Sequence, residues 1–213
     1  MNNIDQEMKN NYPKFDIVFS RHFYDRIIHY GIIKGSNKIL FIKPGLDGSL
    51  VGYKDKYYNL ATYINEKYGF TCICSNNPYD KEHNPLDDAT EVINDYANEM
   101  KYDTYEVYYL GNSNGGVLGA RYAYKYENFK RLLLINPPLF ISYYKIKEGI
   151  EKFNGEKIVF IYGSLDPSIK FVELLDFIKN DKVSYQVLEG EDHNLSSGTY
   201  SLEYLIETYL LKD

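Results

Sequence analysis

The sequence predicts an α/β fold with a mostly parallel sheet and helices on both of its faces. Short apolar runs alternate with amphipathic helical patterns, and this alternation is typical of an open α/β sheet. Several runs are apolar on consecutive residues, which indicates strands that are covered on both faces. The runs lie at 38–43, 71–75, 105–110, 131–135, 157–162 and 183–188.

Helical stripes separate these runs. Apolar residues recur with helical spacing over 89–100 and again over 202–210. Further stretches fit helices at 57–68, 117–126 and 168–179.

The segment before residue 38 differs from the rest. Residues 15–20 and 26–33 resemble two strands with no helix between them, so we expect an antiparallel edge on the parallel sheet. The chain contains no internal repeat, low-complexity tract or long linker. We therefore expect residues 1–213 to form one domain.

Composition and charge exclude several classes of protein. The 213 residues are 44% hydrophobic and 25% charged, which is ordinary for a globular protein and excludes disordered, collagenous and disulfide-scaffold chains. The net charge of −6 argues against a nucleic-acid partner, because phosphate binding favours a basic surface. No apolar run approaches the length of about 18 residues that a membrane span needs. Residues 1–14 lack the apolar core of a secretory signal, so we expect a cytoplasmic protein.

The two cysteines, Cys72 and Cys74, lie two positions apart in a predicted strand. This spacing places both thiols on one face, where a disulfide between them would be strained. We expect two small buried thiols, since no further Cys or His stands nearby to complete a metal site.

The segment from Gly111 to Gly116 reads Gly-Asn-Ser-Asn-Gly-Gly and contains the nucleophile-elbow pattern G-x-S-x-G. The pattern follows a predicted buried strand and opens a predicted helix, so Ser113 is placed on a sharp strand-to-helix turn. Side chains two residues before and after the serine would collide there, which explains Gly111 and Gly115. The alternatives are an ordinary glycine-rich turn or a phosphate-binding loop, but no P-loop lysine follows and no GxGxxG is present.

A serine nucleophile needs a base, and the chain has four histidines. His193 follows the last strand of the series, where loops line the ligand crevice of an open α/β sheet, so it is the preferred base. His22 and His29 lie in or beside the predicted edge strands, where a surface or structural role is expected. His83 lies in a polar loop and is a weaker candidate for the base.

The base needs an acid that fixes its tautomer, and Asp166 follows another strand of the series. Asp166 precedes Pro167, so it also fits a plain helix N-cap. Asp192 is adjacent to His193 in the sequence and points elsewhere in most turn geometries, so it ranks below Asp166.

Acyl transfer also needs donors for the oxyanion that forms in the transition state. One donor is expected to be the backbone N–H of Asn114, the residue after the serine. The second is expected from the glycine-rich loop at 44–49, which otherwise reads as a flexible turn.

The order Ser113, Asp166, His193, each after a strand, resembles the α/β-hydrolase family over residues 38–211. The loop after the third strand of many members reads His-Gly-x-x-Gly; here Pro44 replaces the histidine while Gly45 and Gly48 fit. The resemblance implies that Leu46 supplies the second oxyanion N–H. A serine at the elbow points away from the dehalogenase and epoxide hydrolase branches, which place an acid there.

The family that the chain resembles often carries a lid between the strands that correspond to those at 131–135 and 157–162. Residues 136–156 have room for only one short helix, rich in Pro, Leu, Phe, Ile and Tyr, so a large cap domain is not expected. This segment either packs on the core as an ordinary amphipathic helix or forms a partial apolar wall for an acyl or alcohol group.

The resemblance and the three side chains together predict a serine hydrolase that cleaves carboxylic esters or thioesters, with no cofactor and no metal. An acyltransferase with the same triad, a ligand-binding protein on a hydrolase fold and a lyase are the alternatives. The acyl chain, the leaving group and the oligomeric state stay open. The 24 tyrosines do not identify a substrate.

Overall fold

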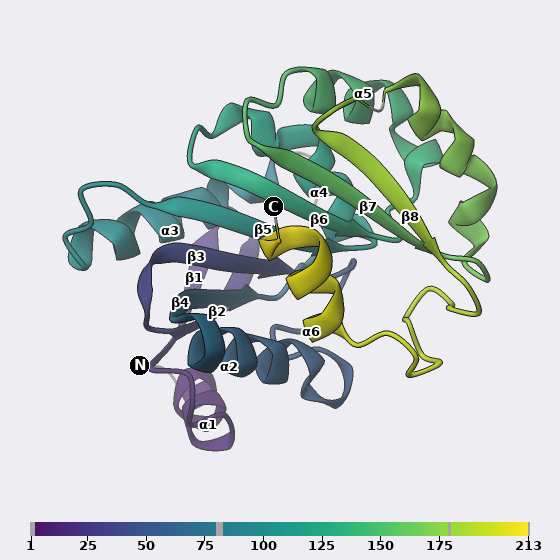
Figure 1. Cartoon of the computed structure of the whole chain (residues 1–213). Helices are drawn as coiled ribbons and strands as arrows, with labels where there is room; N and C mark the ends of the chain where they lie inside the picture. Colours follow the sequence, from purple (N-terminus) through teal and green to yellow (C-terminus); the bar gives the residue numbers. More distant parts are fainter. Residues whose placement is uncertain (1–2, 80–82, 179, 213) are drawn as a thin grey trace. The chain divides into compact units, whose positions relative to one another are not determined.

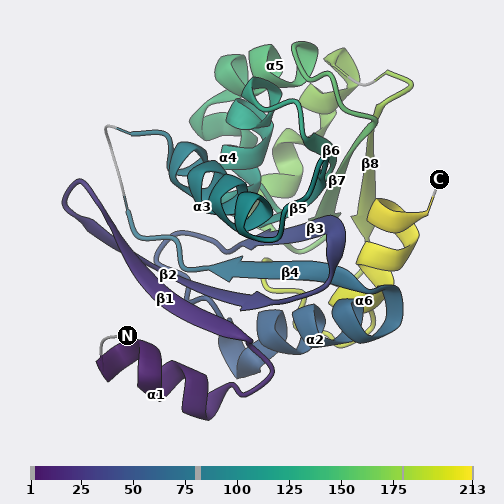
Figure 2. The ribbon, with the colours of Figure 1, turned by 90° about the vertical axis from the view of Figure 1, so that its left-hand side faces the viewer.

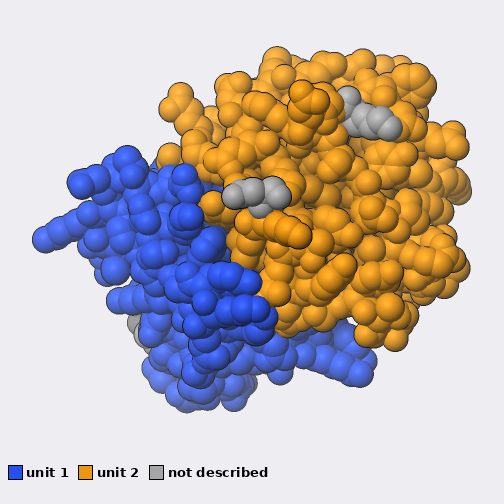
Figure 3. All heavy atoms as spheres, viewed as in Figure 1, with its two compact units in different colours: residues 1–107 blue, residues 108–213 orange. Residues whose placement is uncertain are grey.

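The strands and helices alternate along the chain as the sequence predicts, except near its start, where three strands follow one another after a first helix (Figure 1). The computed structural model describes residues 3–79, 83–178 and 180–212, so Lys179, the end of one predicted helix, lies outside the described residues. The chain divides into two compact units, residues 1–107 and 108–213 (Figure 3). A single domain over residues 1–213 stays a prediction.

The first unit contains four strands in the order β1-β2-β4-β3. Strands β1 and β2 pair antiparallel, as do β2 and β4, whereas β3 and β4 are parallel. Figure 2 shows α2 and α3 on opposite faces of these strands. The elements are α1 (Asn3–Asn11), β1 (Ile17–Phe23), β2 (Arg26–Ile33), β3 (Ser36–Lys43), η1 (Tyr53–Asp55), α2 (Lys56–Tyr68), β4 (Phe70–Ser75) and α3 (Pro85–Glu99).

The second unit contains the strand order β5-β6-β7-β8, with β6, β7 and β8 parallel. Helices α4 and α5 pack together on one face of these strands, and the C-terminal helix lies on the other (Figure 2). The elements are β5 (Glu106–Asn112), α4 (Asn114–Tyr122), η2 (Ala123–Lys125), β6 (Phe129–Ile135), η3 (Leu139–Ile141), α5 (Tyr143–Glu151), β7 (Lys157–Gly163), η4 (Pro167–Phe177), β8 (Val183–Leu188), α6 (Leu202–Leu205) and η5 (Ile206–Leu211).

The predicted fold class, a mostly parallel α/β arrangement with antiparallel N-terminal strands, is confirmed. Burial explains why the apolar runs are continuous. All six residues of β4 are buried, and so are the last six residues of β7. Cys72 and Cys74 are buried and unpaired to each other, as expected.

The helices differ from the sequence-based expectation in three places. The segment predicted as a helix at 168–179 is the 3₁₀ segment η4, and the last turns of the C-terminal helix, η5, widen to a π-helix. Helix α1 was not expected, because its sequence is polar. It is held instead by a polar contact: the Ser20 hydroxyl donates to Oδ1 of the buried Asp5 at 2.6 Å.

Candidate active site

Ser113 is the single residue between the end of β5 and the start of α4. Its backbone has φ 52° and ψ −117°, a conformation that L residues rarely adopt. The turn is held at both ends, because Ser113 N–H donates to the carbonyl of Ile135 at 2.7 Å and the Ser113 carbonyl accepts from Val117 N–H at 3.1 Å. The serine is half-buried at this junction between a strand and a helix.

The glycine before the serine is required by close backbone approach. A Cβ on Gly111 would lie 2.6 Å from the carbonyl oxygen of Gly115, which is backbone and cannot swing away. A Cβ on Gly116 would be 3.1 Å from the Cβ of Pro137, in the segment that follows β6. The packing of this turn therefore accounts for Gly111, as the sequence predicts.

Asp166 and His193 are in direct contact. Asp166 follows β7 and is 1% exposed; its Oδ2 is hydrogen-bonded to Nδ1 of His193, which follows β8. The histidine side chain keeps 40% of its surface exposed. A carboxylate bonded to Nδ1 holds the proton on that nitrogen and leaves Nε2 as the acceptor, which is the tautomer that a general base needs.

Asp166 is an N-cap as well as the partner of His193. Its Oδ1 accepts from Ser168 N–H at 2.6 Å at the start of η4, with Pro167 in the first position. One carboxylate oxygen therefore forms the N-cap and the other contacts His193. The role of Asp166 as the orienting acid stays a prediction.

Asp192 is engaged by its own turn. Its Oδ1 accepts from the N–H groups of Asn194 and Ser196 at 2.9 and 3.1 Å, and its Oδ2 accepts from the Ser196 hydroxyl. The Ser196 hydroxyl and these backbone donors hold the pKa of Asp192 below its usual value. The contacts favour a role in shaping the loop that carries His193.

Two residues of this region escaped the sequence analysis. Glu191 is fully buried and accepts from the backbone and the hydroxyl of Ser197, which folds back the loop around His193. Asn136, directly after β6, is also fully buried. Its side-chain amide is hydrogen-bonded to the backbone of Gly163, at the end of β7, and to the backbone of Asp192 and His193. A signal existed for Asn136, since Asn at a strand end before proline is a turn residue that tolerates positive φ.

The other three histidines belong to the first unit. His22 is exposed on β1, His29 shares a hydrogen bond with the Ser20 hydroxyl at 2.7 Å, and the ring of His83 stacks on Tyr24 with centroids 3.7 Å apart. For His22 and His29 this fits the surface and structural roles expected from the sequence. His83, the weaker candidate for the base, stacks on Tyr24 in the first unit.

The predicted second oxyanion donor, Leu46, also lies in the first unit, whereas Asn114 begins α4 in the second. The loop at 44–49 is tightly wound: a Cβ on Gly48 would lie 2.6 Å from the Cβ of Pro44, and the Asn77 side chain donates to the Pro44 carbonyl at 3.0 Å. The joint use of the Leu46 and Asn114 N–H groups stays a prediction.

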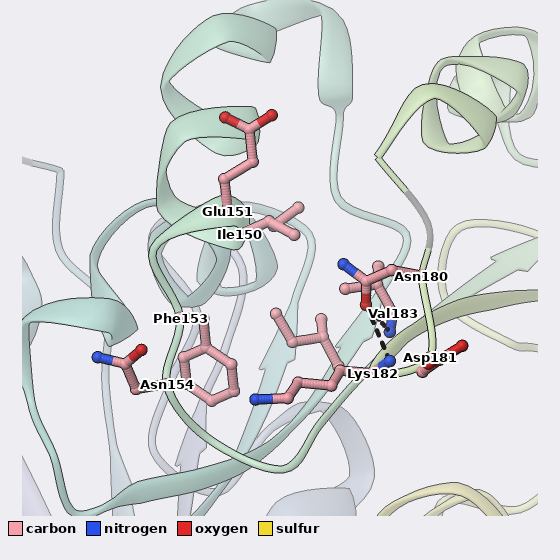
Figure 4. Close-up of a pocket in the computed structure, with 9 residues that line it drawn as sticks. Ile150, Glu151, Phe153, Asn154, Asn180, Asp181, Lys182 and Val183 are labelled. Carbon is pink, nitrogen blue, oxygen red and sulfur yellow. Dashed lines mark hydrogen bonds between the residues drawn. The ribbon is translucent and has the colours of Figure 1, made fainter.

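A pocket of about 390 Å³ in the second unit lies away from these side chains (Figure 4). It is lined by the end of α5 and by Ile158 and Val183, which stand at the amino-terminal ends of β7 and β8. Asp166 and His193 follow the carboxyl ends of the same two strands, so this pocket is not their binding site.

Within the described residues, no group of three or more His, Cys, Asp or Glu side chains is arranged to hold a metal ion. The described helices include none with the length and apolar character that crossing a membrane would require.

Comparison with known proteins agrees with the fold. No protein-family model matches the chain. A proline iminopeptidase of Saccharolobus solfataricus is 30% identical over 119 residues, a match that covers 54% of this chain and only 38% of that protein.

Solved structures match over nearly the whole chain. They include an esterase of Pyrococcus furiosus (TM-score 0.68, 11% identity, 90% of this chain and 88% of that one) and an α/β serine hydrolase homologue of Coxiella burnetii (0.64, 14%, 90% and 93%). A dienelactone hydrolase of Anabaena variabilis matches with a TM-score of 0.64, 13% identity and coverage of 91% and 97%. These likenesses confirm at the level of the fold the resemblance that the sequence carries: the chain has the α/β-hydrolase fold.

Proposed function

We propose that this protein is a serine hydrolase that cleaves carboxylic esters or thioesters through an acyl-enzyme on Ser113. The observation that carries the proposal is the contact between buried Asp166 and His193 in the unit that also presents Ser113 at a strained turn. Plain structural roles would not require both a strained serine after β5 and, after β7 and β8, a histidine bonded to a buried acid.

The proposed reaction uses the three side chains in sequence. Ser113 Oγ attacks the substrate carbonyl carbon while Nε2 of His193 accepts the hydroxyl proton, and Asp166 stays ionised and stabilises the imidazolium. The N–H group of Asn114 stabilises the oxyanion. When the tetrahedral intermediate collapses, the alcohol or thiol leaves with the proton from His193. Water then attacks the acyl-enzyme with the same base, which releases the acid and restores Ser113.

Apolar side chains support an apolar acyl or alcohol group in the substrate. Phe140 and Leu165 are exposed by 57% and 67% in the segments that follow β6 and β7, and the Phe140 ring lies 5.0 Å from that of Phe171. These segments adjoin Asn136 and Asp166, so they fit the partial apolar wall expected of residues 136–156.

A fluorophosphonate probe tests the nucleophile. We expect one label per chain on Ser113, and none on Ser113→Ala, which should fold normally and keep only a small residual turnover from the remaining site. Unchanged turnover of pure Ser113→Ala protein would overturn the assignment. If neither labelling nor turnover is seen in the wild type, a ligand-binding role on a hydrolase fold is favoured.

A substrate panel tests the bond that is cleaved. It should contain p-nitrophenyl esters of increasing chain length, thioesters, and prolyl p-nitroanilide, since one relative is a proline iminopeptidase. We expect turnover of esters or thioesters; a preference for the anilide would contradict the proposed substrate class. Product analysis with added alcohols separates hydrolysis from acyl transfer.

A further inference from the structure

Asn136 has a backbone conformation that few residues accept. It follows the last residue of β6, has φ 48°, and donates its N–H to the Ile161 carbonyl on β7 at 2.8 Å. Asparagine adopts positive φ more readily than most residues, so the conformation alone explains an Asn or Gly here. It does not explain what the side chain does.

The side chain of Asn136 is fully used, although it is completely buried. Its Oδ1 accepts from Gly163 N–H at 2.9 Å, and its Nδ2 donates to the carbonyls of Asp192 and His193 at 3.2 and 3.0 Å. One acceptor and two donors on neighbouring atoms are the inventory of a carboxamide, and neither a carboxylate nor a hydroxyl can supply it.

These bonds join the three chain segments that carry Ser113, Asp166 and His193. The residue before Asn136, Ile135, holds the serine turn by accepting from Ser113 N–H at 2.7 Å. Gly163, which Asn136 binds, accepts in turn from Asp166 N–H at 3.1 Å. The third connection ends on the backbone of His193 itself. One short stretch, Ile135 and Asn136, therefore contacts the backbone beside all three side chains.

We propose that Asn136 is a positioning residue, which sets the place of the His193 backbone and hence of its ring relative to Ser113. The inference rests on the proposed function, because it needs Ser113 and His193 to react together. Asp166 can orient the imidazole about Nδ1, but it cannot fix where the loop holds the histidine. Asn136 supplies that second constraint from the strand beside the serine.

The substitution Asn136→Asp tests the proposal with little change in shape. Aspartate keeps the size, the tolerance of positive φ and the acceptor for Gly163 N–H, but it turns an acceptor toward two carbonyl oxygens. Because a displacement of about 1 Å can cost about 10²-fold in rate, we expect about a 10²-fold loss in kcat and in the rate of Ser113 labelling. KM should change by no more than about threefold, since no substrate contact is removed.

Asn65→Asp is the matched control. The Asn65 side chain also donates to two carbonyls, those of Lys34 and Phe70 at 2.8 Å each, but it belongs to helix α2 in the first unit. We expect Asn65→Asp to lower the melting temperature and to leave the labelling rate unchanged. Asn136→Gly, which keeps the backbone conformation without the amide, should be as slow in labelling as Asn136→Asp.

The outcomes separate this proposal from the proposed function. Wild-type protein that is not labelled on Ser113 refutes the proposed function itself. Labelling of folded Asn136→Asp or Asn136→Gly at the wild-type rate refutes the positioning role alone. Failure of both variants to fold, while Asn65→Asp folds, would make Asn136 a structural residue and would likewise overturn the proposal.

Discussion

The substitution Asp166→Asn tests the geometry of the site most directly, because it changes one carboxylate oxygen and spares the other. The amide can keep its oxygen on Ser168 N–H, where Oδ1 of Asp166 now accepts at 2.6 Å. Asparagine caps helices about as well as aspartate does, so the start of η4 should survive. We expect the free energy of unfolding to change by less than about 1 kcal/mol, the usual value of a single hydrogen bond.

In the proposed mechanism, the rate depends on the other carboxylate oxygen, Oδ2 of Asp166. In Asp166→Asn an NH₂ group would face Nδ1 of His193, where Oδ2 is hydrogen-bonded now. That contact favours a lone pair on Nδ1 and the proton on Nε2, so the ring could no longer accept the Ser113 proton. The wrong tautomer costs about 10⁴-fold in rate in a comparable triad, which corresponds to about 5 kcal/mol in the barrier.

The assay compares kcat for an activated ester with the melting temperature of the same samples. Asp192→Asn is the control, because its amide oxygen can still accept from the N–H groups of Asn194 and Ser196, so the loop that carries His193 should keep its shape. Its rate should stay within a few-fold of the wild type. A stable Asp166→Asn protein that loses only a few-fold in kcat would refute the role given to Asp166. Asp192 would then be the next acid to test.

Two further predictions concern buried titratable groups of the first unit. Burial lowers the pKa of the fully buried Lys43 ammonium to about 7. In the unfolded chain the Lys43 side chain keeps its proton up to about pH 10. Between about pH 7 and about pH 10 the unfolded chain therefore binds more protons than the folded chain, so the free energy of unfolding of the wild type rises with pH. Urea unfolding at about pH 7 and about pH 9.5 should show this rise in the free energy of unfolding of the wild type and a smaller rise for Lys43→Met. An equal rise in both proteins would contradict the prediction. Burial also raises the pKa of both Cys72 and Cys74, so neither thiol should react with a thiol reagent until the protein is unfolded. Rapid reaction of the native protein would contradict the burial of these thiols in β4.

The strands could be predicted from the sequence because their burial requires apolar residue types. A strand covered on both faces needs apolar side chains at nearly every position, and β7 shows this from Ile158 to Tyr162. Helix α1 left no such signal, since its place depends on a hydrogen bond between Asp5 and Ser20. The 3₁₀ form of η4 was equally hidden, because an apolar stripe does not separate close helical geometries.

Candidate side chains can be named from the sequence, whereas their contacts with backbone groups cannot. Ser113, Asp166 and His193 are predicted from residue type and position after a strand, and the structure shows the contact between Asp166 and His193. Asn136 could not be assigned a role, because its partners are a backbone N–H 27 positions away and two backbone carbonyls 56 and 57 positions away. Every residue has such groups, so no sequence pattern marks which of them an asparagine will meet.

Asp166 shows why cap and acid need not be rival explanations. A carboxylate that rotates freely about its side-chain bonds loses conformational entropy when it forms a hydrogen bond with His193. The bond from Ser168 N–H to Oδ1 removes that freedom, so Oδ2 is presented to Nδ1 by the start of η4. Proline in the following position supports the same local geometry, since its fixed φ suits the first helical residue. The Asp-Pro pair thus orients the carboxylate toward His193. Asp166→Ser would keep the N-cap but lose the hydrogen bond to Nδ1 of His193.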